Sequence, residues 1–143
     1  MKLNIFIDKE REEEVIVYAH EKNTIVTSIE RLVNENSAEF IGYKEDKAVK
    51  LELSEIYCFT VEDNKIYAYT ETDKFQIKQR LYKIEELLPD SFIKLNKSCI
   101  GDTNKIQSFG AAFSGSLTVA FKNGYTDYVS RRNMKNVKER FGL

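Results

Sequence analysis

Two adjacent arginines near the carboxyl end, Arg131 and Arg132, have the most specific chemistry in this sequence. They stand in the stretch YVSRRNMKNVKER, where Ser130 precedes a run with helical spacing of apolar residues, so both arginines fall at a helix start. The amino end of a helix carries partial positive charge and favours anions over cations. A guanidinium fork binds two acceptors at once, on a phosphate or on the edge of guanine. The placement therefore predicts that an external anion binds there.

Basic residues are concentrated in the last part of the chain. Residues 91–143 hold nine Lys or Arg and three Asp or Glu, a net charge of +6, whereas residues 1–90 hold 13 and 20, a net charge of −7. The total of −1 hides this segregation, which is typical of a protein with one half that faces a polyanion. Nucleic acid is one candidate partner; an uneven scatter of surface charge is the other interpretation.

Residues for catalysis or metal binding do not cluster in the sequence. There is one histidine, His20, and no glycine-rich phosphate loop or nucleophile motif occurs. Cysteine and histidine lack the spacing of a metal site. Cys58 and Cys99 lie in apolar runs, where we expect reduced core thiols rather than a redox pair. The sequence therefore predicts no enzymatic activity, no metal and no cofactor.

Length and composition predict a folded cytoplasmic protein. The 143 residues, 42% of them hydrophobic and 12% aromatic, suffice for a buried core. No apolar run approaches the roughly 20 residues that span a bilayer. The amino end, MKLNIFIDKEREEE, turns acidic too early for a secretory leader.

The elements that must position the arginines begin with a β-β-α segment over residues 1–40. KLNIFI alternates apolar and polar residues, and EVIVYAH is a second β-branched run. A helix over IVTSIERLVNEN follows, capped by Asn23 or Thr24, with an apolar face of Ile25, Ile29, Leu32 and Val33. The best boundary after it is Asn36 to Glu39.

Residues 41–143 predict a succession of short antiparallel strands. Polar turns at residues 44–47, at Glu62-Asp63-Asn64 and at Asn123-Gly124 separate β-branched and aromatic runs, and each marks a hairpin. FQIKQ is a further strand, and SFIKLNKSCIGDTNKIQSF contains two strands around a polar break.

Two short helices complete this part. Pro89 stops the first, and Ser130 caps the second. Their apolar positions are expected to face inward: Leu81, Ile84, Leu87 and Leu88 in the first helix, and Met134, Val137 and Phe141 in the second.

The order of elements over residues 41–143 resembles the LytTR DNA-binding domain of bacterial response regulators. Three stretches carry the resemblance: SEIYCFTVEDNKIYAYTETDKFQIKQRLYKIEELL, FIKLNKSCIGDTNKIQSF and SLTVAFKNGYTDYVSRRNMKNVKERF. The last is the most specific, because its Asn-Gly turn, VSRR step and closing helix come at the family's spacing. The resemblance implies a mainly β fold with small α additions (α+β), built from elongated antiparallel sheets. It also implies loops that enter successive major grooves of double-stranded DNA.

Carried over by position, the resemblance implies three DNA-contacting loops. Their residues are Asn64 and Lys65 in the first, Asn96, Lys97 and Ser98 in the second, and Arg131, Arg132, Asn133 and Lys135 in the third. Arg132 is expected to read a base. Arg131 could instead anchor a strand, Ser98 could be a structural hydroxyl, and Asn64 could be a turn former alone. Asp63 would repel a phosphate, and Asn96-Lys97 replaces the His-Arg that the family usually has.

The resemblance also implies a difference in regulation. Most relatives carry a phosphorylated receiver domain, but residues 1–40 are too few to form one, so Asp8 is not expected to accept a phosphate. We therefore expect a stand-alone regulator, active as a homodimer, whose residues 1–40 pack on the domain or form the dimer contact. The sequence predicts a sequence-specific transcription regulator. The alternative is a protein-interaction module, an anti-regulator that keeps the fold without binding DNA, which the net charge and Asp63 leave open.

Overall fold

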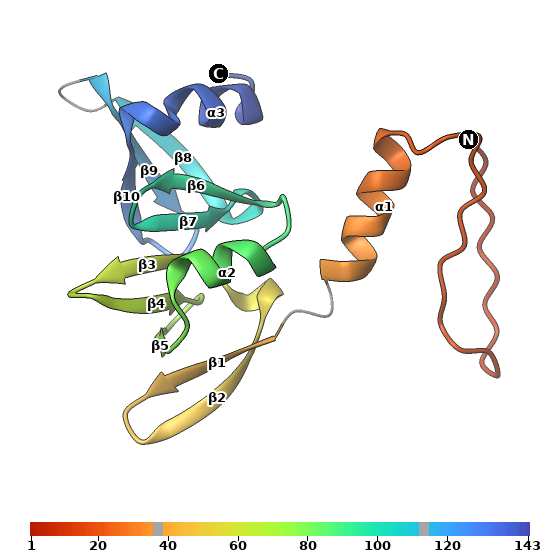
Figure 1. The fold of residues 1–143 in the computed structure, drawn as a ribbon, viewed down its shortest axis with the longest axis horizontal. Coiled ribbons are helices and arrows are strands. Elements are labelled where there is room, and N and C mark those ends of the chain that lie inside the picture. Colours follow the sequence, from red (N-terminus) through yellow and green to blue (C-terminus); the bar gives the residue numbers. More distant parts are fainter. Residues whose placement is uncertain (36–38, 112–114) are drawn as a thin grey trace.

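Seven antiparallel strands form the larger of two sheets, in the order β2-β1-β5-β4-β3-β7-β6 (Figure 1). The structure is a computed structural model and describes residues 1–35, 39–111 and 115–143. The strands are β1 (Glu39–Lys44), β2 (Lys47–Glu52), β3 (Cys58–Glu62), β4 (Lys65–Tyr69), β5 (Lys74–Ile77), β6 (Phe92–Asn96) and β7 (Cys99–Asp102).

A second sheet of three strands, in the order β10-β9-β8, packs beside the first. Its strands are β8 (Ile106–Ala111), β9 (Leu117–Phe121) and β10 (Thr126–Val129). The helices are α1 (Thr24–Glu35), α2 (Leu81–Leu87) and α3 (Arg131–Phe141), with short 3-10 turns η1 (Leu53–Glu55) and η2 (Thr103–Lys105). The mainly β fold with small α additions is therefore confirmed.

The hairpin turns follow from residues that tolerate a positive φ. Asp63 and Asn64, between β3 and β4, have φ of 50° and 62°, and Gly124, between β9 and β10, has φ of 91°. Asn, Asp and Gly adopt such angles with little strain, and they form the tight turns that match the twist of paired strands. Both hairpins predicted from these residues are confirmed.

Two hydrophobic clusters hold the sheets and helices together. One lies between the larger sheet and α2 and includes Phe59 and Ile84, both fully buried. The other joins the two sheets to α3 through Phe121 and Val137. A Cβ at Gly101 would lie 2.6 Å from the Phe121 ring, so this glycine permits the close approach of the second sheet.

The predicted inward faces of the two later helices are confirmed except at Leu87. Met134 and Phe141 pack beside buried Val137, and Leu81 and Leu88 pack beside buried Ile84. The exposed fraction of Leu87 is 56%, so its predicted inward position is wrong. α2 ends before Pro89, as the missing proline N–H requires.

The amino-terminal segment departs from the β-β-α prediction. The helix α1 forms, with the Val26 N–H donating to Asn23 Oδ1 at 3.0 Å, but residues 1–23 contain no strand. An isolated pair of strands is marginal in water without a third strand or a helix on one face. The alternation of apolar and polar residues was therefore not sufficient to predict strands here. The predicted boundary at residues 36–39 falls mainly on residues 36–38, outside the described ranges.

Candidate nucleic-acid interface

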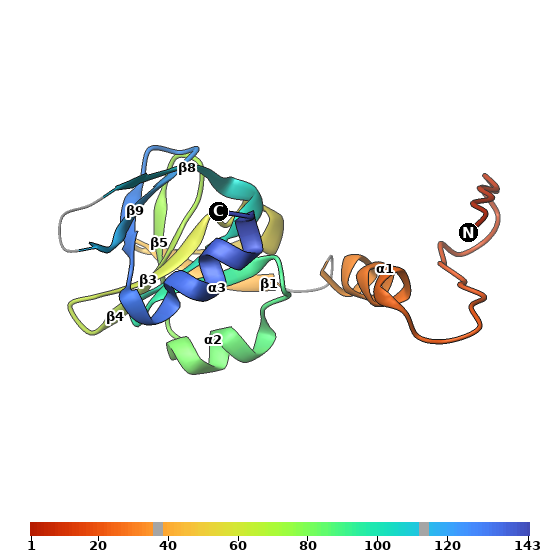
Figure 2. The same ribbon diagram turned by 90° about the horizontal axis from the view of Figure 1, so that it is seen from above.

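The three loops predicted to contact DNA lie at one end of the molecule. Figure 1 shows the β3–β4 turn, the β6–β7 turn and the start of α3 on the same side, and Figure 2 shows the same for the β3–β4 turn and the start of α3. Two backbone hydrogen bonds tie them together. Val61 N donates to Ser98 O at 2.8 Å, and Ser130 N donates to Leu95 O at 2.9 Å. The pairing of β3 with β7 completes the frame, so the three loops have fixed relative positions.

Asn96 is the residue that joins the second loop to the third. Its Nδ2 donates to Asp127 Oδ1 at 2.9 Å and to Tyr128 O at 2.8 Å, and its Oδ1 accepts from Ser98 N at 2.8 Å. The side chain is 1% exposed. Both kinds of atom of this buried amide are engaged within the protein. In this structure Asn96 therefore positions Lys97 and the start of α3, and the DNA contact predicted for it stays a prediction.

Asp127 is an acid at this end whose carboxylate is directed into the protein. Its Oδ1 also accepts from Tyr128 N at 2.8 Å, and its Oδ2 accepts from the Tyr125 hydroxyl at 2.6 Å. Burial, followed by the bond to Asp127, raises the pKa of Tyr125, so the phenol stays protonated. These donors compensate the negative charge of Asp127, which reduces its repulsion of an approaching phosphate.

A second tyrosine continues this network toward the β3–β4 hairpin. The Tyr69 ring stacks on Tyr125 with centroids 4.2 Å apart, and the Tyr69 hydroxyl donates to Glu62 Oε2 at 2.8 Å. Burial and the bond to Glu62 raise the pKa of Tyr69. Sequence reasoning missed Tyr125 and Asp127. A signal was present, because alternation along β10 places both on the face of buried Val129.

Four cations form what we call the cationic end: Lys97, Arg131, Arg132 and Lys135. All four side chains are exposed, Lys97 in the β6–β7 turn and the others in the first turns of α3. Among the residues that the structure describes, the ion pairs involve other cations, so Lys97, Arg132 and Lys135 have no carboxylate within 4.0 Å. The like charges of Lys97, Arg132 and Lys135 repel one another, and an external anion relieves that repulsion.

The start of α3 lacks a conventional N-cap hydrogen bond and has a bond between two side chains instead. Ser130 holds the N-cap position but its hydroxyl makes no cap bond; it accepts from Asn133 Nδ2 at 2.8 Å instead. The half-buried Asn133 thus braces the helix start. The predicted DNA contacts of Asn133, Ser98 and the four cations stay predictions.

The β3–β4 turn is the least cationic of the three loops. Asn64 and Lys65 are exposed, and so is Asp63 beside them. The positive φ of Asn64 agrees with the turn-former interpretation, without testing a DNA contact of Asn64 or Lys65.

Glu62, at the base of this turn, remains charged but engaged. Burial alone would raise the pKa of Glu62, but hydrogen bonds from Thr60, Lys74 and Tyr69 outweigh it and hold the pKa below the usual value. Lys74 Nζ lies 3.0 Å from Glu62 Oε1. Lys74, from the same sheet, therefore neutralises the charge of Glu62.

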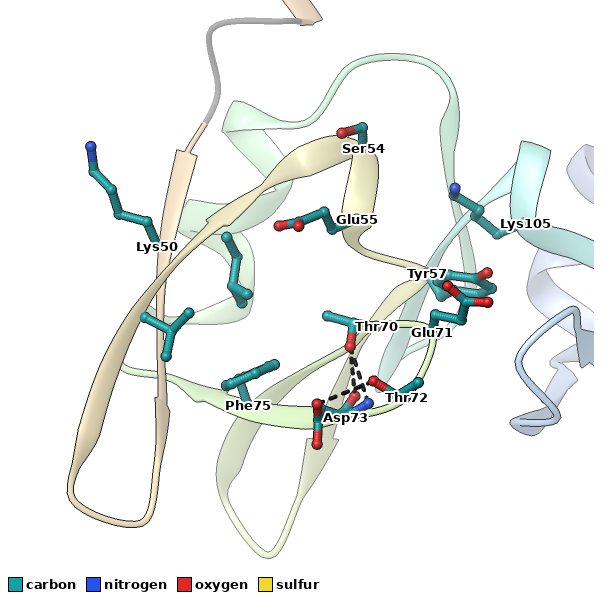
Figure 3. A pocket seen from close by; sticks show the side chains of 12 residues that line it. Lys50, Ser54, Glu55, Tyr57, Thr70, Glu71, Thr72, Asp73, Phe75 and Lys105 are labelled. Carbon is teal, nitrogen blue, oxygen red and sulfur yellow. Dashed lines mark hydrogen bonds between the residues drawn. The ribbon is translucent and has the colours of Figure 1, made fainter.

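A groove of about 470 Å³ lies at the other end of the larger sheet (Figure 3). β4 leads from the Asn64 turn to Thr70, which lines this groove with β2, η1 and Lys105. Two of its acids have internal partners: Asp73 pairs with Lys44, and Glu55 Oε2 accepts from Glu52 N at 3.0 Å. In the described ranges, no buried side-chain nitrogen or oxygen lacks a hydrogen-bond partner. The groove therefore contains no buried polar atom that awaits a ligand.

Other kinds of site find no support in the described parts of the chain. No group of three or more His, Cys, Asp or Glu side chains is placed to hold a metal ion in residues 1–35, 39–111 and 115–143. Over the same ranges, no helix has the length and apolar character that a membrane crossing needs.

Comparisons with known proteins agree with this β-rich architecture. The sequence profile of the LytTr DNA-binding domain matches residues 46–142. The LytTr DNA-binding domain of a putative methyl-accepting/DNA response regulator from Bacillus cereus has a similar structure. Its TM-score is 0.69 at 23% identity, covering 75% of this chain and 99% of that one, which shows the shared fold.

Full-length relatives occur in Staphylococcus aureus. Proteins of strains MSSA476 and NCTC 8325, both named as uncharacterised HTH-type transcriptional regulators, are 34% and 33% identical over 146 residues. Each alignment covers 100% of this chain and 99% of the relative.

The fold and the profile match define a DNA-binding domain of mainly β structure. The chain belongs to the LytTr DNA-binding domain family. The resemblance drawn from the three sequence stretches is thereby confirmed.

Proposed function

We propose that this protein is a cytoplasmic transcription regulator that recognises specific sequences in double-stranded DNA through its loops. The observation that carries the proposal is the gathering of Lys97, Arg131, Arg132 and Lys135 on loops that share one buried hydrogen-bond network. Fixed loops lose little conformational freedom on binding, so their contacts contribute more fully to affinity and specificity.

The cations divide by chemistry into base-reading and phosphate-binding groups. Arg132 presents a planar fork that fits the O6 and N7 acceptors of guanine in the major groove. Lys97 and Lys135 are point charges and suit phosphates, which position a protein on the duplex without reading sequence. The helix start supplies partial positive charge for a phosphate as well.

The names of the staphylococcal relatives support transcription regulation but imply a different reading device. Those proteins are named HTH-type, that is, helix-turn-helix. Within the described residues of this chain, strands separate each helix from the next, so no two helices are consecutive in the manner of that motif. We therefore assign recognition to the loops and not to an inserted helix.

The protein-interaction alternative has no observation in its favour. Membership of a DNA-binding family supports DNA as the ligand, and so do Lys97, Arg132 and Lys135, which have no carboxylate partner among the described residues. Asp63, which left the alternative open, lies in the β3–β4 turn and not in the cationic end, and the carboxylate of Asp127 is turned inward.

The test is selection of bound duplexes from a random DNA pool, followed by affinity measurements at several salt concentrations. We expect one enriched sequence and a steep loss of affinity with salt. Lys97 and Lys135, with or without Arg131, neutralise two or three phosphates, which corresponds to a slope of log K against log salt of about −2 to −3 per bound copy. A pool without enrichment, together with a flat salt response, would overturn the proposal.

A further inference from the structure

The amino-terminal segment, residues 1–35, exposes an unusual amount of apolar surface. Besides the terminal Met1, ten large side chains here are at least half exposed: Leu3, Ile5, Phe6, Ile7, Val15, Ile16, Tyr18, Ile25, Leu32 and Val33. Isolated exposed apolar residues are common, but a contiguous series of this size marks an interaction surface.

The remainder of the chain does not cover this surface. In the described residues, neither hydrophobic cluster includes a residue before Phe40, so both cores are complete without the segment. Figures 1 and 2 show α1 and residues 1–23 to one side of the sheets. A salt bridge joins the exposed side chains of Arg31 and Asp90 at 2.5 Å, and an exposed ion pair of this kind contributes little to stability and buries no apolar area.

The backbone before α1 also has no long-range hydrogen-bond partner among the described residues. Across residues 1–22, the hydrogen bond found is the local one from Glu10 N to Asp8 Oδ1 at 3.0 Å. Yet residues 3–7 and 15–18 alternate and are β-branched, which suits them to a sheet. Two strands alone are marginal in water, so pairing with further strands would stabilise the segment.

Charge limits what can supply those strands. Residues 1–35 hold five Lys or Arg and eight Asp or Glu, a net charge of −3. A phosphate backbone or an anionic membrane surface is repelled by that balance. The acids of DKEREEE lie between the two β-branched runs, where a turn would place them at the rim of a contact. The occupant is therefore protein.

We propose that the occupant is the same segment of a second copy, so that two amino-terminal segments form one intermolecular sheet covered by the two α1 helices. Strand edges are self-complementary under a two-fold axis, which gives an isologous contact. Burying the ten apolar side chains removes roughly 800–1,000 Å² per copy, which matches or exceeds a standard interface. The proposal deepens the proposed function, because the contact would pair two DNA-binding domains. The biological use of the contact rests on the proposed function, whereas the contact itself does not.

The test is the oligomeric state of the full-length protein without DNA, measured by sedimentation over a range of concentrations. We expect a dimer, and we expect Leu32→Asp to weaken it by more than about 100-fold, since each copy would bury an unpaired carboxylate. Leu87→Asp is the matched control, because Leu87 is also an exposed helical leucine, 56% against 62% for Leu32, on the DNA-binding domain. That variant is expected to remain dimeric.

Amide hydrogen exchange gives a second readout. We expect slow exchange at residues 3–7 and 15–18 in the dimer, and fast exchange in Leu32→Asp while the strands of the domain stay protected. A monomer at all concentrations, or a dimer that Leu32→Asp leaves intact, would overturn the proposal. Because these measurements contain no DNA, their failure is separate from any failure of DNA recognition.

Discussion

Replacing Asn96 by alanine tests whether a buried amide positions the DNA-contacting loops. The change removes the bonds to Asp127, to Tyr128 O and from Ser98 N. A hydrogen bond between neutral groups contributes about 1 kcal/mol and one to a charged group about 1.5–3 kcal/mol, so the loss is about 3–5 kcal/mol. The free energy of unfolding of a domain of this size is about 5–15 kcal/mol, so the variant can remain folded in mild conditions.

The measurement is urea unfolding followed by circular dichroism, combined with DNA affinity under conditions where the variant is folded. Besides its lower stability, we expect about tenfold weaker binding to the selected duplex. That change corresponds to about 1.4 kcal/mol of binding free energy. It is a modest part of the conformational free-energy cost of ordering the two released loops again on binding.

Asn123→Ala is the control, because Asn123 also makes two side-chain hydrogen bonds but at the other end of the sheet. Its Nδ2 donates to Thr70 O at 2.9 Å, and its Oδ1 accepts from Tyr125 N at 3.0 Å. We expect about 2 kcal/mol of destabilisation and no change in DNA affinity. The reasoning is refuted if Asn96→Ala costs less than about 1 kcal/mol, or if both variants weaken DNA binding equally.

Three further predictions concern the cationic end and the buried thiols. Arg132→Ala should cost about 1–3 kcal/mol on the selected duplex and little on random DNA, measured by fluorescence anisotropy; equal losses would reduce Arg132 to a phosphate contact. Lys97→Ala should weaken both duplexes alike and lower the salt slope by about 1, in the same titrations. The thiols of Cys58 and Cys99 are buried, and the hydrogen bond with Cys58, together with burial, raises the pKa of Cys99. Cys99 therefore stays a thiol at pH 8, and a disulfide-exchange reagent should label native protein far more slowly than protein in urea.

Local signals explain which elements could be predicted from the sequence. The Asp63-Asn64 and Asn123-Gly124 turns depend on the φ angles of their own residues, and the inward face of α3 depends on the spacing of Met134 and Val137. Such features need no knowledge of distant residues, and the hairpins and the helix formed as expected.

Features that depend on distant partners could not be predicted. Asn96 is buried because Asp127 and Tyr128, more than thirty positions later, accept its hydrogen bonds. The family resemblance instead placed Asn96 in a DNA-contacting loop. Residues 1–23 alternate as strands do, but a strand also requires a neighbour, which alternation does not provide.

The central claim, that DNA lies against the cationic end, is tested most directly by recording backbone amide shifts of labelled protein during titration with the selected duplex. We predict large shifts at Lys97, Ser98, Arg131 and Arg132, smaller ones at the Asn64 turn, and none around Thr70 in the groove of Figure 3. Shifts confined to that groove or to the amino-terminal segment would contradict the account.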